Sequence, residues 1–281
     1  MSDLIIKVRK KPRYKSVSLT LPALERQFQT FLSWLTPIDP AAQQNNHFQQ
    51  RQSGTGVWLL NSPQYASWVG GECSTLFCPG IPGAGKTILT SVVVEDLWKR
   101  FGRDQNIGVA YLYCDYKNRE QQTTMDLIAI LLKQLIRKNI SLPDSIHDLY
   151  KRHEERKTRP SLEEISQSLS SVIGSFSRAF IVVDALDELS DNDGTCFRLL
   201  SELFRVRDSS PSRVGLFATS RYIPHITDRF RECTKLDIRA NDDDMSSYLW
   251  SHVPTLPSCV SEASGLDKEI IAEVVKTANG M

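Results

Sequence analysis

Residues 80–87, GIPGAGKT, form the segment whose chemistry is clearest, because they fit the pattern GxxxxGK[ST] at every position. The glycines admit backbone conformations that side chains forbid, so that successive N–H groups can turn toward one anion. A helix that begins near Lys86 would point its positive end at the same anion. The segment is therefore predicted to bind the phosphates of a nucleotide.

The residues of this loop have different expected roles. Lys86 should reach the β and γ phosphates, and the Thr87 hydroxyl should bind a magnesium ion. The backbone around them should provide the remaining contacts. The predicted nucleotide-binding residues here are Gly80, Pro82, Gly83, Ala84, Gly85, Lys86, Thr87 and Ile88.

A second group of candidates follows the fully apolar segment 180–183, which has the character of a central strand in a parallel sheet. Ligands of open α/β sheets bind at the carboxyl ends of the strands. Asp184 is placed there to hold magnesium through water. Asp187 or Glu188 could orient or deprotonate an attacking water, although both acids could instead cap the next helix.

A third apolar segment, 216–219, leads to Arg221. An arginine at this strand end could contact the γ phosphate and sense its presence. The alternative is an exposed arginine that simply follows a strand. Asp187, Glu188 and Arg221 are the predicted catalytic residues, and Thr87 and Asp184 the predicted metal-binding ones.

These residues must be positioned by an alternation of strands and helices. We expect strands over 76–78, 109–114, 180–183 and 214–219, a last short strand that includes Leu236 and Ile238, and helices over 21–35, 63–69, 86–98, 124–136, 146–156, 162–173 and 197–204. Such alternation is typical of a parallel sheet covered by helices on both faces. Residues 1–20 read as an irregular tail with a basic run, and the Gln- and Asn-rich stretch 41–53 as a polar linker.

The composition argues against nucleic-acid binding, a membrane span and export. Lys and Arg number 34 against 33 Asp and Glu, so no field of one sign indicates a nucleic-acid partner. No apolar run approaches the ~18 residues that a membrane span needs. The six cysteines lie scattered, without metal-binding spacing or an export signal, which favours a reducing cytoplasmic location.

Four segments together resemble the NACHT-type, STAND-class NTPases, and more closely the nephrocystin-3-like N-terminal domain of NACHT proteins. They are residues 54–60 with Tyr65 and Trp68, the Walker A loop 80–87, the apolar strand with a DxxDE form of Walker B at 180–188, and 219–221 with the sensor arginine. Residues 113–116 and 236–239 match more loosely. The similarity covers roughly residues 53–281.

The resemblance implies an α/β P-loop core of the RecA-like (ASCE) kind that binds Mg²⁺ and ATP and holds ADP after turnover. It also implies that Arg221 senses phosphate and that Thr55 and Gly56 lie near the base. Members of this class act as signalling switches that self-associate, and they continue into a helical lid, a winged helix and usually a repeat array. We therefore expect an N-terminal basic tail, helical arm and linker over 1–52, the core over 53–239, and the start of a truncated lid over 240–281.

Three alternatives to a slow ATP-hydrolysing switch stay open. The segment 234–237, TKLD, resembles the motif that recognises guanine in GTPases, with Asp237 on the base. However, the preceding residues are not an apolar strand, and Asp184 is followed by Asp187 where GTPases have glycine. A small-molecule phosphotransferase would need an acceptor site, for which no motif is visible. The third alternative is an interaction module, with an unidentified protein partner, that nucleotide stabilises without turnover.

Overall fold

The computed structural model describes residues 21–138, 144–190, 194–209, 214–255 and 265–278. The basic run predicted near the N-terminus lies outside these residues. The strands are β1 (Thr75–Pro79), β2 (Ile107–Tyr113), β3 (Arg178–Asp184), β4 (Val214–Ser220) and β5 (Thr234–Lys235). The longer helices are α1 (Leu21–Leu35), α2 (Ala41–Gln49), α4 (Pro63–Gly70), α5 (Lys86–Phe101), α6 (Thr124–Lys138), α7 (Asp144–Arg156), α8 (Leu162–Gly174), α9 (Thr195–Ser209), α11 (Asp242–His252) and α13 (Leu266–Ala278).

The strands form one sheet in the order β2-β3-β4-β1-β5, and all neighbouring strands pair in parallel. The predicted α/β fold with a P-loop NTPase sheet is thereby confirmed. Because β4 lies between β1 and β3, the carboxyl ends of these three strands adjoin at one edge of the sheet. The Walker A loop, the DxxDE segment and Arg221 each follow one of these three ends.

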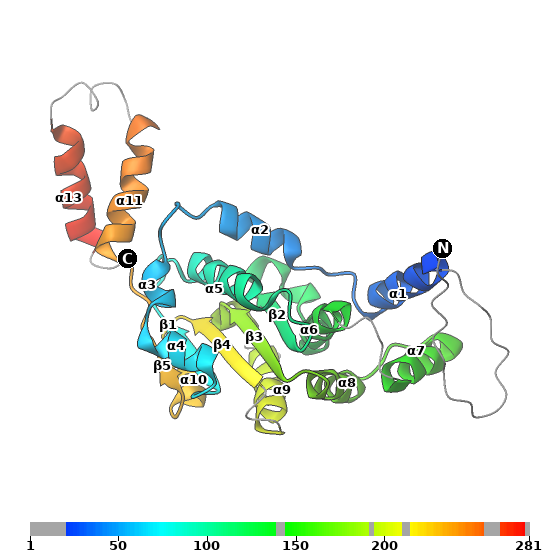
Figure 1. The fold of residues 1–281 in the computed structure, drawn as a ribbon. Coiled ribbons are helices and arrows are strands. Elements are labelled where there is room, and N and C mark those ends of the chain that lie inside the picture. Colours follow the sequence, from blue (N-terminus) through cyan, green and yellow to red (C-terminus); the bar gives the residue numbers. More distant parts are fainter. Residues whose placement is uncertain (1–20, 139–143, 191–193, 210–213, 256–264, 279–281) are drawn as a thin grey trace.

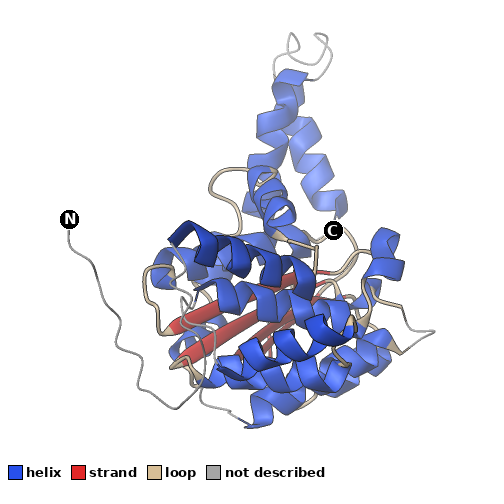
Figure 2. Cartoon of the chain, turned by 90° about the vertical axis from the view of Figure 1, so that its right-hand side faces the viewer, coloured by secondary structure: helices blue, strands red, loops and turns tan. Residues whose placement is uncertain are grey.

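Side chains of the strands alternate between two apolar cores, as the two-residue period of a strand requires. In β3, Phe180 and Val182 belong to a core shared with α4 and α5, whereas Ile181 and Val183 belong to a core shared with α6, α8 and α9. The strands are therefore covered on both faces, which explains why they are apolar along their whole length. Figure 2 shows helices on both sides of the strands.

The N-terminal helix α1 has the predicted bounds and packs on α6 and α7 (Figure 1). Phe31 and Leu32 are buried in the core on that face of the sheet. Lys133 of α6 holds the end of the arm, because its Nζ donates to the carbonyls of Thr36 (2.6 Å) and Ile38 (3.2 Å). The arm is thus part of the packed structure.

The prediction of a polar linker over 41–53 is wrong, because residues 41–49 form α2 and pack along α5. The helix is held by hydrogen bonds as well as by packing. The buried Gln44 side chain donates to the Ser91 carbonyl (3.0 Å) and accepts from the Tyr113 hydroxyl. A helix attached mainly through a polar side chain shows no apolar periodicity in its sequence.

The last strand differs from its prediction in its bounds. β5 covers only Thr234–Lys235, and Leu236 and Ile238 follow it. These two residues still pair with β1, because their N–H groups donate to the carbonyls of Phe77 (3.0 Å) and Pro79 (2.7 Å). The pairing therefore reaches the start of the Walker A loop, where Gly80 and Ile238 form an isolated bridge.

Helices α11 and α13 pack on each other and project away from the sheet and its covering helices (Figure 1). Both helices lie within residues 240–281, where the start of a helical lid is expected. Asp244 near the start of α11 connects them to the core, because its Oδ2 accepts a hydrogen bond from the Gly56 N–H (2.8 Å). Among the described residues, no helix combines the length and apolar character needed to cross a membrane.

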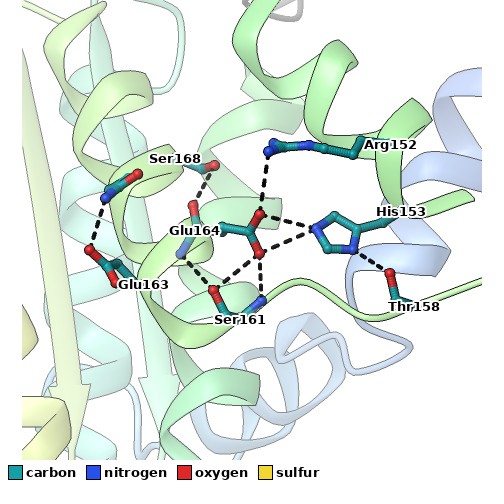
Figure 3. Close-up of polar contacts among 8 residues, drawn as sticks. Arg152, His153, Thr158, Ser161, Glu163, Glu164 and Ser168 are labelled. Carbon is teal, nitrogen blue, oxygen red and sulfur yellow. Dashed lines mark hydrogen bonds and ion pairs between the residues drawn. The ribbon is translucent and has the colours of Figure 1, made fainter. Parts of the chain in front are cut away.

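A polar cluster joins α7 to α8 on the side of the molecule away from this helical pair. Ser161 and Glu164 form a capping box at the start of α8, and Glu164 also contacts His153 (3.2 Å) and Arg152 of α7 (Figure 3). The Ser161 N–H is the main cause that lowers the pKa of Glu164. The cluster therefore holds α7 against the start of α8.

Candidate functional site

The loop between β1 and α5 has the conformation that its glycines predict. Gly83 and Gly85 have φ values of 80° and 82°, in the left-handed region. Gly80 is required for a different reason, because a Cβ there would lie 2.5 Å from the Ile238 carbonyl oxygen. The loop is thus shaped by two left-handed glycines and by one close backbone approach.

Lys86 opens α5 and turns back over the loop. Its Nζ donates to the carbonyls of Gly80 (2.9 Å) and Ile81 (2.8 Å). Burial lowers the pKa of Lys86, and the nearby carboxylates of Asp187 and Asp184 act in the opposite direction. The site therefore holds its ammonium group next to two acidic residues, at the position where a phosphate would require a cation.

Asp184 ends β3 as a fully buried carboxylate that accepts three hydroxyl hydrogen bonds. The donors are Thr87 to Oδ2, and Thr90 and Thr219 to Oδ1, each at 2.7 Å. Burial raises the pKa of Asp184, and the three hydroxyl bonds partly oppose this effect. The contact with Thr87 brings together the two residues that were predicted to bind magnesium.

Thr90 and Thr219 were not among the predicted site residues. Thr90 follows Thr87 by three positions on α5, which places both hydroxyls on one face of the helix. That spacing is a signal from which Thr90 could have been found. Thr219 lies near the end of β4, and no local pattern in the sequence links it to Asp184. Its contact with Asp184 follows only from the pairing of β4 with β3.

A tight turn after Asp184 directs the following acids toward the loop. Ala185 has φ 53° and ψ 52°, a left-handed conformation that costs free energy for a residue other than glycine. Its N–H donates to the Thr219 hydroxyl at 2.8 Å, which anchors the turn to β4. The short 3₁₀ helix Leu186–Glu188 follows and carries both acids.

Asp187 and Arg221 are paired across the ends of β3 and β4. The Arg221 side-chain Nε lies 2.5 Å from Asp187 Oδ2, and the Arg221 backbone N–H donates to Oδ1 at 2.8 Å. The Asp187 side chain is 4% exposed, whereas that of Arg221 is 48% exposed. The hydrogen bond that the Arg221 side chain donates to Asp187 is the main cause that raises the pKa of Arg221.

Glu188 faces the segment that follows β2. Its Oε2 accepts a hydrogen bond from the Tyr116 N–H at 3.2 Å. Burial raises the pKa of Glu188, and the charges of Asp187 and Asp184 raise it further. A carboxylate with a raised pKa is suited to take a proton from water near neutral pH.

These residues surround a cavity of about 650 Å³, lined by Pro82, Gly83, Gly85, Lys86, Thr87, Ile88, Tyr116, Ala185, Asp187, Glu188 and Arg221. Nine of these were predicted from the sequence. Tyr116 and Ala185 were not, since an exposed tyrosine and an alanine carry no recognisable chemistry by themselves. Of the predicted residues, Gly80, Ala84 and Asp184 lie behind the lining, where they shape the loop or hold Thr87.

Thr55 and Gly56, expected near the base of a nucleotide, are not among the residues that line this cavity. Gly56 has φ 77°, and a Cβ there would lie 2.9 Å from Leu89 Cδ2. The Thr55 hydroxyl donates to the Gln52 carbonyl at 2.8 Å. Gly56 therefore sits between α5 and the start of α11.

The donors at the site suit magnesium. Mg²⁺ binds oxygen ligands and is commonly held by one or two protein groups together with phosphates and water. Thr87 and Asp184 offer a hydroxyl and a carboxylate in direct contact. Among the residues that the model describes, no cluster of three or more His, Cys, Asp or Glu residues forms a separate metal site.

Solved structures similar to this chain share 12–15% sequence identity with it. They include a DNA replication initiation factor (15% identity, 83% of this chain and 60% of that chain, TM-score 0.45), the ORC2 protein of Aeropyrum pernix (12%, 73% and 52%, TM-score 0.45) and a Walker-type ATPase of Pyrococcus abyssi (14%, 76% and 65%, TM-score 0.43). This chain thus spans less than two thirds of the length of each of these three. No curated protein matches the sequence.

A family model gives the more specific result. The model described as "Nephrocystin 3, N-terminal" matches residues 54–221. This range begins at the turn before α3 (Val57–Leu60), contains the Walker A loop and the DxxDE segment, and ends at Arg221. Since it covers more than half of the chain, the protein belongs to the Nephrocystin 3, N-terminal family.

Proposed function

We propose that this protein binds Mg²⁺ and ATP in the cavity above the Walker A loop and hydrolyses ATP slowly. The nucleotide state would control self-association in a signalling switch. The observation that carries the proposal is the convergence of three strand ends on one cavity. Lys86, Thr87 and Arg221 line it, and Asp184 contacts Thr87 from behind the lining.

The chain's own groups suggest a division of roles. The N–H groups of the loop and the ammonium of Lys86 would bind the phosphates, which requires Lys86 to leave the carbonyls that it now contacts. Thr87 and Asp184 would hold the magnesium ion, whose charge would offset that of the phosphates. Arg221, which also lines the cavity, would contact the γ phosphate.

The sequence admits either Asp187 or Glu188 as the residue that activates water. The structure favours Glu188 for that role, because both oxygens of Asp187 already accept hydrogen bonds from Arg221. The raised pKa of Glu188 suits a group that must exchange a proton. We therefore assign Glu188 to water and Asp187 to Arg221.

The coupling to self-association is supported by the link between α11 and the core. The Gly56 N–H, in the segment expected near the base, donates to Asp244 of the projecting helical pair. A nucleotide that contacted this segment would compete with or reorient that bond. Such differential contact with two arrangements is what a ligand needs to shift a conformational equilibrium.

A GTP-binding function finds less support in the geometry. Asp237, which would have to contact guanine, interacts with the Tyr222 hydroxyl and is not part of the cavity lining. The backbone on either side of it, at Leu236 and Ile238, pairs with β1. Asp237 is thus held at the sheet edge.

The test is a titration of the purified chain with Mg·ATP and with Mg·GTP, in which released phosphate is followed in the same samples. We expect ATP to bind more tightly and phosphate to appear slowly. Tighter GTP binding would give Asp237 the base-recognition role and contradict the ATP assignment. Binding without phosphate release would support the interaction module that nucleotide merely stabilises.

A further inference from the structure

The Asp187 carboxylate is paired with Arg221, the cation that is proposed to contact the γ phosphate. Arg221 lines the cavity, and its Nε and backbone N–H are both directed to Asp187. Asp187 lines the same cavity, and among the nearby carboxylates its charge raises the pKa of Lys86 the most. Arg221, the cation proposed to sense the γ phosphate, is therefore already paired with an internal anion, and Lys86 lies within the electrostatic influence of the same anion.

Asp187 has little solvent to compensate for the loss of Arg221. Its side chain is 4% exposed, so its charge depends on the groups around it. A γ phosphate that engaged the Arg221 guanidinium would leave Asp187 with only the Arg221 backbone N–H and would add negative charge next to the same carboxylate. Both effects weaken the binding of a triphosphate. A diphosphate, which ends one phosphate earlier, would leave the pair intact.

We propose that Asp187 is a specificity-determining residue that competes with the γ phosphate for Arg221 and so sets the relative affinity for ATP and ADP. This inference rests on the proposed function, because it concerns the same cavity. Asp187 thereby acts on binding through Arg221 and does not activate water. The site distinguishes ATP from ADP because Arg221 is held by Asp187, and only a triphosphate has to displace Asp187 from it.

The experiment measures dissociation constants for Mg·ADP and for the slowly hydrolysed analogue ATPγS in the wild type and in D187N, R221Q and the double variant. D187N keeps an oxygen that can accept the Arg221 N–H but removes the charge. We expect D187N to tighten ATPγS binding about three- to tenfold, in line with the strength of such ion pairs, and to change ADP binding less than about twofold. When R221Q is also present, D187N should change the dissociation constant for ATPγS less than it does alone.

The matched control is D228N. Asp228 forms an ion pair with Arg231 (3.0 Å) in which both side chains are exposed and which lies outside the cavity lining. This variant should leave both dissociation constants unchanged. A general effect of removing one negative charge would instead appear in D228N as well, and would overturn the inference.

The remaining outcomes separate the inference from the proposed function. Weaker ATPγS binding in D187N, or equal shifts for both nucleotides, would overturn the role of Asp187 while ATP binding by the wild type stood. A wild type that bound neither nucleotide would overturn both. Thermal melting of the four proteins without added nucleotide gives an independent readout, in which D187N and R221Q should be non-additive. Additive effects would show that the two residues are not coupled and would also overturn the inference.

Discussion

The Thr87 hydroxyl donates to Asp184 Oδ2 at 2.7 Å and so joins the first turn of α5 to the end of β3. The two residues are 97 positions apart in the chain. One belongs to the phosphate loop and the other to the acidic strand end, which the sequence shows as separate motifs. Their contact makes one site of both motifs, and the predictions below test the consequences.

Asp184→Asn is expected to stabilise the protein without nucleotide and to weaken its magnesium-dependent nucleotide binding. Burial raises the pKa of Asp184. The folded protein therefore loses stability as the pH rises through that pKa and the carboxyl group ionises. An amide at this position does not ionise and avoids the loss. A gain of ~1 kcal/mol would raise the melting temperature by about 2–4 °C.

The geometry at Asp184 accommodates the amide. Its oxygen can replace Oδ1 as acceptor for Thr90 and Thr219, and its nitrogen can donate to the Thr87 oxygen. Melting curves should show a gain near pH 7 that shrinks in acid, and D228N should show none. A lower melting temperature near pH 7 would contradict the account of Asp184.

Glu188→Gln is expected to abolish most phosphate release while nucleotide binding persists. Burial raises the pKa of Glu188, and only the ionised form can accept a proton. The wild-type rate should therefore fall as the pH drops through that raised pKa, and the variant should lack this acid limb. Loss of a general base lowers rates by about 10²- to 10⁴-fold. Glu163→Gln on the exposed face of α8 is the control, and an unchanged rate in E188Q would rule out the assigned role.

Gly80→Ala is expected to destabilise the fold by ~1–3 kcal/mol, because its Cβ would meet the Ile238 backbone and force β1 and the following segment apart. Gly174→Ala is the matched control, since a Cβ at the end of α8 would meet nothing within 4 Å. Chemical denaturation measures both. Equal stability of the two variants would contradict the close approach at Gly80.

Gln44→Ala tests whether α2 is an integral part of the core. The change removes partners from the Ser91 carbonyl and the buried Tyr113 hydroxyl, and leaving such groups unsatisfied costs ~1–3 kcal/mol. Gln49→Ala, on the exposed side of the same helix, should be nearly neutral. A loss of stability no larger in Q44A than in Q49A would indicate that α2 is a peripheral element after all.

Much of this architecture could be predicted from local pattern. The apolar run of β3 and the helical spacing in α1 each reflect a face that packs against many neighbours, so burial leaves a period in the sequence. The loop 80–87 could be assigned because its chemistry depends on residue types at fixed spacing. Helix α2 could not be predicted in this way, because its buried side chain is that of Gln44. A helix without an apolar face has the same polar composition as a linker.

The site was predicted less completely than the fold for a related reason. Thr219 and Tyr116 act through contacts with residues 35 and 72 positions away, and no spacing in the chain encodes those distances. The pairing of Asp187 with Arg221 likewise depends on β4 lying next to β3. Residue types identified the candidates, whereas the strand order decided which of them meet.

The most direct test of the central claim compares Mg·ATP binding in the wild type, Lys86→Ala and Lys99→Ala. Lys99 lies on the same helix with an exposed side chain that contacts Glu95. Removing the Lys86 ammonium should cost ~1.5–3 kcal/mol, or about a ten- to hundredfold loss of affinity, whereas K99A should bind as the wild type does. An affinity for ATP in K86A equal to that of the wild type would contradict the assignment of this cavity to nucleotide.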